Sequence, residues 1–285
     1  MFGVLCTEGA DVPMLPSPVA GTARVAGHFG ELLQGRLGGG GPVVLVTLPC
    51  PVRAAQAVVL PSRRLSLQQA TPVVTLDRLT RMLDLLDLPR QGRFRLRTEM
   101  PPGGGAGAST AALLALGMAC GRDAGTVARA CLAVEGASDP LQFAAPERVL
   151  WASRKGQVLA ALPAMPRIEV LGGFWGDGLR TDPQDHDFPD ISDLVTAWPA
   201  ACTEVRKVAA LASQSARRTL DLRGPKGDPT ETLARKWGAL GFVVAHTGSA
   251  RGLIFAPGTV PEAAVADLRS AGFSRITRFR CGGGG

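Results

Sequence analysis

The chain has 285 residues, of which 46% are hydrophobic, 36 are glycine and 22 are proline. Glycine and proline together make up roughly a fifth of it, above the usual 12% or so but below the roughly 25–30% that is typical of disordered chains. The glycines show no three-residue period, which excludes collagen, and a chain of this length can bury a large core. The net charge of +7 comes from scattered arginines, aromatic residues make up only 5%, and tyrosine is absent. These features argue against nucleic acid as a partner and suit a small anionic ligand.

The cysteines and the N-terminus indicate a cytoplasmic protein. The six cysteines form neither CxxC pairs nor a dense disulfide framework. The first 18 residues contain Glu8 and Asp11 and lack the apolar stretch of a signal peptide. No run approaches 18 uninterrupted apolar residues, so we expect no contact with a membrane.

The first half of the chain follows a loose lead-in at residues 1–20 and mixes strands with helices. Strands are predicted at residues 22–28, 42–48, 53–60 and 92–99, with a turn at Cys50 and Pro51 between the second and the third. Helices are predicted at residues 76–86, 108–120 and 126–135. The first of these helices is followed by Pro89, which ends it.

The second half repeats this mixture after an irregular middle. Strands are predicted at residues 167–171, 241–245, 252–255 and 274–280, and helices at 205–218, 230–240 and 260–271. There is no internal repeat of 20–50 residues. The fold class is therefore α+β, with one domain at residues 21–163, a second at 164–285, and a proline-containing seam near 160–166.

The loop at residues 100–111 (MPPGGGAGASTA) carries the strongest chemical signal. It joins a predicted strand to an apolar helix, and its glycines allow left-handed backbone and close approach of a ligand. The free amides and the dipole at the start of the helix favour an anion. Ser109 and Thr110 lie in the first turn, where a hydroxyl can reach a phosphate-bound Mg²⁺. The sequence of this loop therefore predicts a phosphate-binding site. The alternative is a plain turn in which Ser109 caps the helix.

Two common phosphate-binding loops do not fit. A P-loop requires a lysine, and residues 1–154 contain none. The dinucleotide fingerprint is matched only in its relaxed form, by Gly103, Gly105 and Ala108. A second helix follows instead of the expected strand with an acid near its end.

The loop resembles the second motif of the GHMP kinase superfamily, P-x-G-x-G-L-G-S-S-A. Matching residues are Pro101, Gly103, Gly105, Gly107 and Ser109; departures are Ala106, Ala108 and Thr110. The resemblance implies that ATP is bound by the residues of this loop, which are Pro102, Gly103, Gly104, Gly105, Ala106, Gly107, Ala108, Ser109 and Thr110. It also implies that Ser109 is a ligand of Mg²⁺.

Residues 27–35 (GHFGELLQG) resemble the opening of one branch of that superfamily, the L-threonine kinases of cobalamin synthesis and propanediol utilisation. The signature of that branch reads G-S-C-G-E-L-x-Q-G, so His28 and Phe29 replace Ser-Cys. A carboxylate at Glu31 and an amide at Gln34 suit the ammonium and hydroxyl groups of a small amino acid. The resemblance implies that His28, Glu31 and Gln34 bind substrate; the alternative is that Glu31 and Gln34 are solvated turn residues.

Residues 134–143 (VEGASDPLQF) resemble the segment E-P-[ST]-D-x-x-x-F of the same branch, with one extra residue. The resemblance implies that Asp139 is the catalytic base, or the group that orients the substrate, and that Glu135 binds Mg²⁺ together with Ser109. Phosphoryl transfer depends mainly on positioned charge and needs one such carboxylate. The alternative is that both acids only terminate and cap a helix.

Residues 243–255 (VVAHTGSARGLIF) resemble the stretch V-A-H-[ST]-G-T-x-x-G-L-x-F of the branch. This implies that His246, Thr247, Gly248 and Ser249 bind substrate, by contact with its carboxylate or with the transferred phosphate. The three histidines have no metal-ligand spacing.

Taken together, the resemblance implies the GHMP architecture, in which a domain like ribosomal protein S5 domain 2 is followed by a ferredoxin-like domain. The expected activity is ATP- and Mg²⁺-dependent phosphorylation of the side-chain hydroxyl of L-threonine, giving O-phospho-L-threonine for the aminopropanol arm of cobalamin. Alternatives are another hydroxy compound, such as L-serine or homoserine, and a non-catalytic nucleotide-binding protein. The expected partners are ATP and a small substrate; the oligomeric state stays open, a homodimer included.

Overall fold

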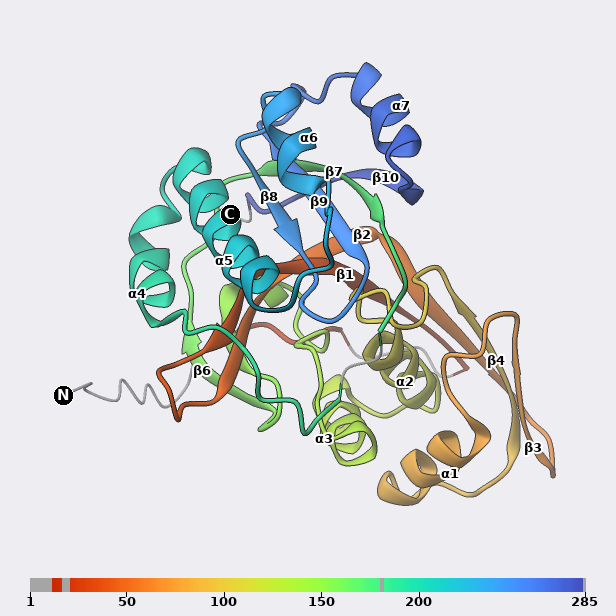
Figure 1. Cartoon of the computed structure of the whole chain (residues 1–285). Helices are drawn as coiled ribbons and strands as arrows, with labels where there is room; N and C mark the ends of the chain where they lie inside the picture. The colour runs from red at the N-terminus through yellow and green to blue at the C-terminus, as the bar shows by residue number, and fades with distance from the viewer. Residues whose placement is uncertain (1–11, 17–20, 180–181, 284–285) are drawn as a thin grey trace.

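The computed structural model describes residues 12–16, 21–179 and 182–283, and contains two β-sheets with helices packed on them (Figure 1). The six strands of the first sheet are β1 (Thr22–Arg36), β2 (Val43–Leu60), β3 (Leu65–Gln69), β4 (Gly92–Thr98), β5 (Val149–Ala152) and β6 (Gln157–Ala161). They run in the order β3-β4-β2-β5-β6, with β1 paired to β2. All pairs are antiparallel except β3 with β4.

Three helices accompany the first sheet: α1 (Leu76–Leu85), α2 (Ala108–Ala119) and α3 (Ala124–Glu135). Helix α2 packs directly on β1 and β2, and α1 and α3 pack against α2. Because it is covered on all sides, α2 is apolar around its whole circumference, and only Ser109 among its residues is not fully buried. Helix α1 begins at the N-cap Thr75, and α3 begins at Asp123, whose carboxylate accepts from Thr126 N at 2.9 Å.

The second sheet contains β7 (Ile168–Phe174), β8 (Gly241–Val244), β9 (Ala250–Phe255) and β10 (Ser274–Cys281). Its helices are α4 (Ser192–Ala201), α5 (Val205–Arg223), α6 (Thr230–Lys236) and α7 (Ala263–Ser270). The strand order is β10-β7-β9-β8, and all pairs are antiparallel. This is the ferredoxin-like order, fourth-first-third-second, so the predicted α+β class and the predicted architecture of this half are confirmed.

The structure corrects two predicted boundaries in the first sheet. The strand predicted to end at His28 continues to Arg36, and the turn predicted at Cys50 and Pro51 lies inside β2. Ala26 pairs with Ala54 while Gly27 pairs with Cys50, so residues 51–53 form a bulge in a continuous strand. A bulge tolerates Pro51 because its missing N–H is not needed in the ladder.

Several elements were not predicted: β3, β5, β6, α4 and a 3₁₀ turn at Pro146–Arg148. Of the predicted lead-in, residues 1–11 and 17–20 lie outside the described residues. Met14 forms a bridge with Phe143, and Leu15 N donates to Gln142 O at 2.8 Å.

One hydrophobic core joins the two sheets. It contains Val25 and Leu114 from the first half together with Val170 and Val208 from the second. Residues 162–167 connect the sheets, and Leu162 within them is buried in the same core. No helix in the described part of the chain has both the length and the apolar character needed to cross a membrane. The five cysteines in the described ranges are all free.

Candidate active site

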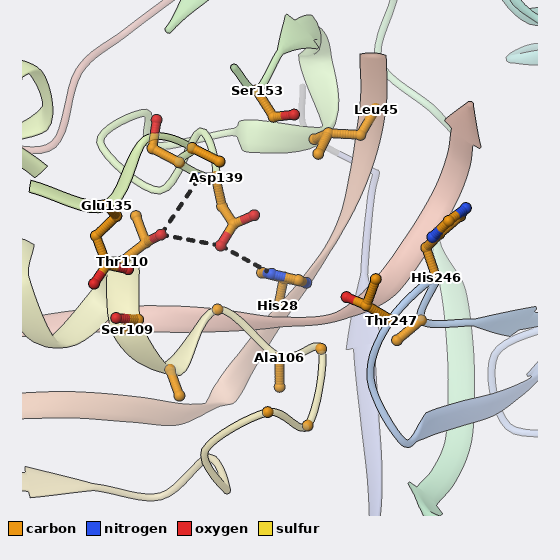
Figure 2. Close-up of a pocket in the computed structure, with 18 of the residues that line it drawn as sticks. His28, Leu45, Ala106, Ser109, Thr110, Glu135, Asp139, Ser153, His246 and Thr247 are labelled. Atoms are coloured by element: carbon orange, nitrogen blue, oxygen red, sulfur yellow. Dashed lines mark hydrogen bonds and ion pairs between the residues drawn. The ribbon is translucent and has the colours of Figure 1, made fainter. Parts of the chain in front are cut away.

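A cavity of about 210 Å³ lies where the glycine loop, β1, the end of α3 and the turn after β8 meet (Figure 2). All nine residues predicted for the nucleotide line it: Pro102, Gly103, Gly104, Gly105, Ala106, Gly107, Ala108, Ser109 and Thr110. The predicted residues His28, Glu31, Gln34, Glu135, Asp139, His246 and Thr247 line it too. Four chain segments far apart in sequence therefore meet at one cavity.

The glycine loop is held in place by hydrogen bonds from both sheets. Gly30 N donates to Gly105 O at 3.0 Å, and Ala250 N donates to Gly104 O at 2.8 Å. Gly103, Gly105 and Gly107 have φ angles of +71°, +67° and +68°, a region in which other residues are strained. The loop is thus a fixed part of the cavity wall.

The N-terminus of α2 faces this cavity without a side-chain cap. Gly107 occupies the N-cap position, so Ser109 lies inside the helix and does not cap it. Its Oγ is buried and has no hydrogen-bond partner among the described residues. The first-turn amides of a helix lack intrahelical partners and favour an anion. This wall therefore suits a phosphate group.

Asp139, His28 and Glu31 form a chain of ionisable groups in the same cavity, in which His28 and Glu31 are buried and Asp139 is partly exposed. Asp139 Oδ2 accepts from Thr110 Oγ1 at 3.1 Å and lies 3.3 Å from His28 Nε2 (Figure 2). On the other side of the ring, His28 Nδ1 lies 3.3 Å from Glu31 Oε1 and 3.2 Å from Gly30 O. Because the two carboxylates face opposite nitrogens of one imidazole, the arrangement suits a relay of hydrogen bonds rather than a shared metal site.

The pKa values of these groups are shifted by burial and by one another. Burial would lower the pKa of His28, but the carboxylates of Glu31 and Asp139 outweigh it and raise this pKa to about 9. Burial raises the pKa of Glu31 to about 8, against the opposing effect of His28. Burial also acts to raise the pKa of Asp139, but the charge and hydrogen bonds of His28 and Thr110 lower it below its usual range. At neutral pH Asp139 is therefore an anion beside an imidazolium.

The oxygen atoms near the start of α2 fit a magnesium ion. Glu135, the last residue of α3, lines the same cavity as Ser109 (Figure 2). Its Oε1 is 2.9 Å from Arg78 Nη1, so the carboxylate is already held by a cation. A hydroxyl and a carboxylate are ligand types that Mg²⁺ prefers, and the free Oγ of Ser109 gives one such ligand. These residues fit a magnesium nucleotide.

Two of the residues predicted to bind substrate lie outside the cavity lining. Gly248 and Ser249 do not line the cavity. A Cβ on Gly248 would lie 2.2 Å from Gly105 N, so this glycine lets the two loops touch. Ser249 is buried, and its carbonyl oxygen accepts from Trp175 N at 2.8 Å. The alternative for Glu31 and Gln34 is also excluded, because they belong to strand β1 and not to a solvated turn.

Four residues near the site were missed. Arg78 and Arg154 line the cavity, whereas Phe188 and Arg223 contact His246. None belongs to a recognisable motif, and each reaches the site only through the tertiary fold. The many arginines of the chain gave no signal that could separate these three from the rest.

Solved structures of small-molecule kinases share this fold. The mevalonate kinase of L. major in complex with R-mevalonate has 14% identity and a TM-score of 0.64, over 94% of this chain and 98% of that one. The phosphomevalonate kinase of Streptococcus pneumoniae has 12% identity and a TM-score of 0.61, over 92% of this chain and 98% of that one. The homoserine kinase of Cytophaga hutchinsonii has 14% identity and a TM-score of 0.56, over 94% of this chain and 96% of that one. No protein-family model matches the chain, and neither does any curated protein. The predicted GHMP kinase architecture is confirmed at the level of the fold.

Proposed function

We propose that this protein is an ATP- and Mg²⁺-dependent kinase of the GHMP type that phosphorylates the side-chain hydroxyl of L-threonine. One observation carries the proposal. The uncapped N-terminus of α2, with the free hydroxyl of Ser109, faces the same cavity as the ionised Asp139. The fold that the chain shares with the mevalonate and homoserine kinases supports this assignment.

The nucleotide lies against the glycine loop and α2 in this proposal. The amides of Ala108, Ser109 and Thr110 hold phosphate oxygens, and Ser109 with Glu135 holds the metal. When bound, Mg²⁺-ATP supplies the phosphoryl group and neutralises its charge. Arg78 keeps the carboxylate of Glu135 directed at this wall.

Asp139 orients the hydroxyl of the acceptor. Its hydrogen bonds to Thr110 and His28 hold the carboxylate in one place and keep its pKa low. A carboxylate with a low pKa is a weak base, and phosphoryl transfer through a loose transition state needs little proton removal before the new bond forms. Asp139 therefore positions the hydroxyl and accepts its proton late.

Glu31 and Gln34 border the acceptor end of the cavity and recognise a small amino acid. The product is O-phospho-L-threonine, an intermediate of the aminopropanol arm of cobalamin synthesis, and the enzyme acts in the cytoplasm. L-serine or homoserine is the second candidate acceptor, because His28 and Phe29 depart from the branch signature.

The test is release of ADP from Mg²⁺-ATP in the presence of L-threonine, L-serine, homoserine and simple alcohols. L-threonine should stimulate ADP release most, and Asp139→Asn should reduce kcat about 100-fold or more. Asp221→Asn, at an exposed position on α5, is the control and should behave like the wild type. If no acceptor stimulates ADP release, the protein is not a kinase; if Asp139→Asn keeps its full rate, the role given to Asp139 is wrong.

A further inference from the structure

Arg154 is a half-buried cation in the cavity wall, and it forms no close ion pair with the residues that the structure describes. It lies just after β5 and lines the cavity. Its Nη1 donates to Ser153 Oγ at 2.9 Å, and its Nη2 donates to the carbonyl oxygen of Asp185 at 3.5 Å. Neither acceptor carries charge, and its Nε is buried with no partner in the described part of the chain. A partly buried cation that lacks a close ion pair favours an anionic ligand at this position.

His246 presents a second free donor to the same cavity. Its Nδ1 lies 3.3 Å from Arg223 Nη1. Arginine can only donate, so Nδ1 is the acceptor and the ring proton of a neutral His246 resides on Nε2. Burial and the positive charge of Arg223 lower the pKa of His246 to about 3, so the ring is neutral. Its Nε2 is buried and unpartnered among the residues that the structure describes.

The ring of Phe188 contacts both donor side chains, His246 and Arg154. Its ring stacks on His246 with the centroids 3.6 Å apart and the planes 14° from parallel. The guanidinium carbon of Arg154 lies 5.1 Å from the centre of the same ring. Arg223 forms an ion pair with Asp185, at 2.5 Å. The carboxylates of Asp185, Asp139 and Asp182 act on Arg154 electrostatically, but none in the described ranges forms an ion pair with it. Arg154 thus contributes a positive charge to this wall without a close ion pair among the described residues.

We propose that Arg154 and His246 Nε2 together bind the carboxylate of the acceptor substrate. A carboxylate only accepts hydrogen bonds and carries one negative charge, which matches two free donors and one unpaired cation. A phosphate oxygen of the nucleotide has the same chemistry, but the amides of α2 already provide for it on another wall. The substrate class is therefore hydroxy acids rather than neutral alcohols. This inference rests on the proposed kinase function.

The test measures binding directly, by calorimetry in the presence of Mg²⁺-ADP, for L-threonine and for its uncharged amide, L-threoninamide. The wild type should bind L-threonine about 10- to 100-fold more tightly than the amide. Arg154→Gln and His246→Gln should each remove most of this preference, and Arg148→Gln, at an exposed position outside the cavity, should keep it.

Each result separates this inference from the proposed function. Carboxylate-dependent binding that Arg154→Gln abolishes supports the inference even if no ADP is released, in which case only the kinase activity fails. Equal loss of binding for L-threonine and L-threoninamide in the variants overturns it, since this would indicate a structural role. A wild type without preference for the carboxylate also overturns it. So does an Arg154→Gln protein in which only nucleotide binding weakens, because the guanidinium would then serve a phosphate.

Discussion

At the scale of single residues, the two neighbours His28 and Phe29 have opposite tasks. Both depart from the branch signature, and both lie at an irregular part of β1, where the pairing register with β2 shifts after His28. His28 faces the cavity and Asp139, whereas Phe29 is fully buried in the core between the sheets. His28 therefore contributes to the chemistry of the site, and Phe29 contributes to the packing of the core.

The buried carboxyl group of Glu31 should make stability depend on pH. Its pKa is raised from 4.5 to about 8, so between these two pH values the folded protein holds a proton that the unfolded chain has released. This contribution is present below the unfolded pKa and is lost as pH rises through about 8. His28, with a pKa raised to about 9, acts in the same direction. The free energy of unfolding should therefore fall between about pH 6.5 and 8.

Glu31→Gln should make this fall shallower by up to about 1.4 kcal/mol per pH unit, the value for one proton. The measurement is urea unfolding at several pH values in this range, which lies above the range where titration of His246 has the opposite effect. Glu204→Gln, at an exposed glutamate on the surface, is the control. Identical slopes for the wild type and Glu31→Gln would contradict a buried, protonated Glu31.

At the scale of elements, the cavity depends on contact between the glycine loop and the turn at residues 245–250. A Cβ on Gly105 would lie 2.2 Å from the Cβ of Ala245, and a Cβ on Gly248 would lie 2.2 Å from the backbone N of Gly105. The hydrogen bond from Ala250 N to Gly104 O fixes the two segments in register. Gly248 was predicted to bind substrate; in the structure it lies against the glycine loop, where a Cβ would meet the backbone of Gly104 and Gly105.

Gly248→Ala should therefore damage both stability and nucleotide binding. The added Cβ would meet backbone atoms of Gly104 and Gly105 at 2.2–2.5 Å, and backbone cannot yield as a flexible side chain does. Overpacking of this kind costs about 1–3 kcal/mol, or roughly 2–10 °C in Tm for a chain of this size. Thermal unfolding with and without Mg²⁺-ATP measures both effects. Gly40→Ala, at a hairpin tip where a Cβ meets nothing within 4 Å, is the matched control; equal Tm values for the two variants would refute the contact.

The elements that sequence reasoning predicted are those with a strong local signal. Strand β4 alternates buried and exposed residues, and α1 has a clear apolar stripe and the N-cap Thr75. Strand β5 was missed because its four residues are buried on both faces and show no alternation. Helix α4 was missed because Pro199 lies inside it.

The motifs of the site were predicted because each is contiguous in sequence, as for the loop before α2. Arg154 and Phe188 could not be predicted, because Phe188 meets His246 and Arg154 only in the folded chain. Their partners lie dozens of residues away, and no local pattern marks such contacts. The same holds for the ion pair between Arg78 and Glu135, which joins α1 to α3.

At the scale of the whole molecule, Phe29 connects the two sheets. Its ring lies edge-on to Phe174 of β7 at 5.3 Å and to Phe279 of β10 at 5.6 Å, although Phe29 itself belongs to the first sheet. A Cβ on Gly172 would lie 2.5 Å from this ring, so the second sheet has a glycine where the ring enters. Because one core spans both sheets, the wild type should unfold in a single transition.

Phe29→Ala should weaken the connection between the sheets and not only the fold as a whole. Loss of a buried phenylalanine costs about 3–5 kcal/mol. The space left by the missing ring of Phe29 would lie between the two sheets, so the sheets should no longer unfold cooperatively. In urea, far-UV circular dichroism and tryptophan fluorescence should give coincident curves for the wild type and separate curves for Phe29→Ala. Phe94→Ala removes an equally buried ring from within the first sheet, and its curves should shift to lower urea but stay coincident. Coincident curves for both variants would show that the sheets are joined by contacts other than Phe29.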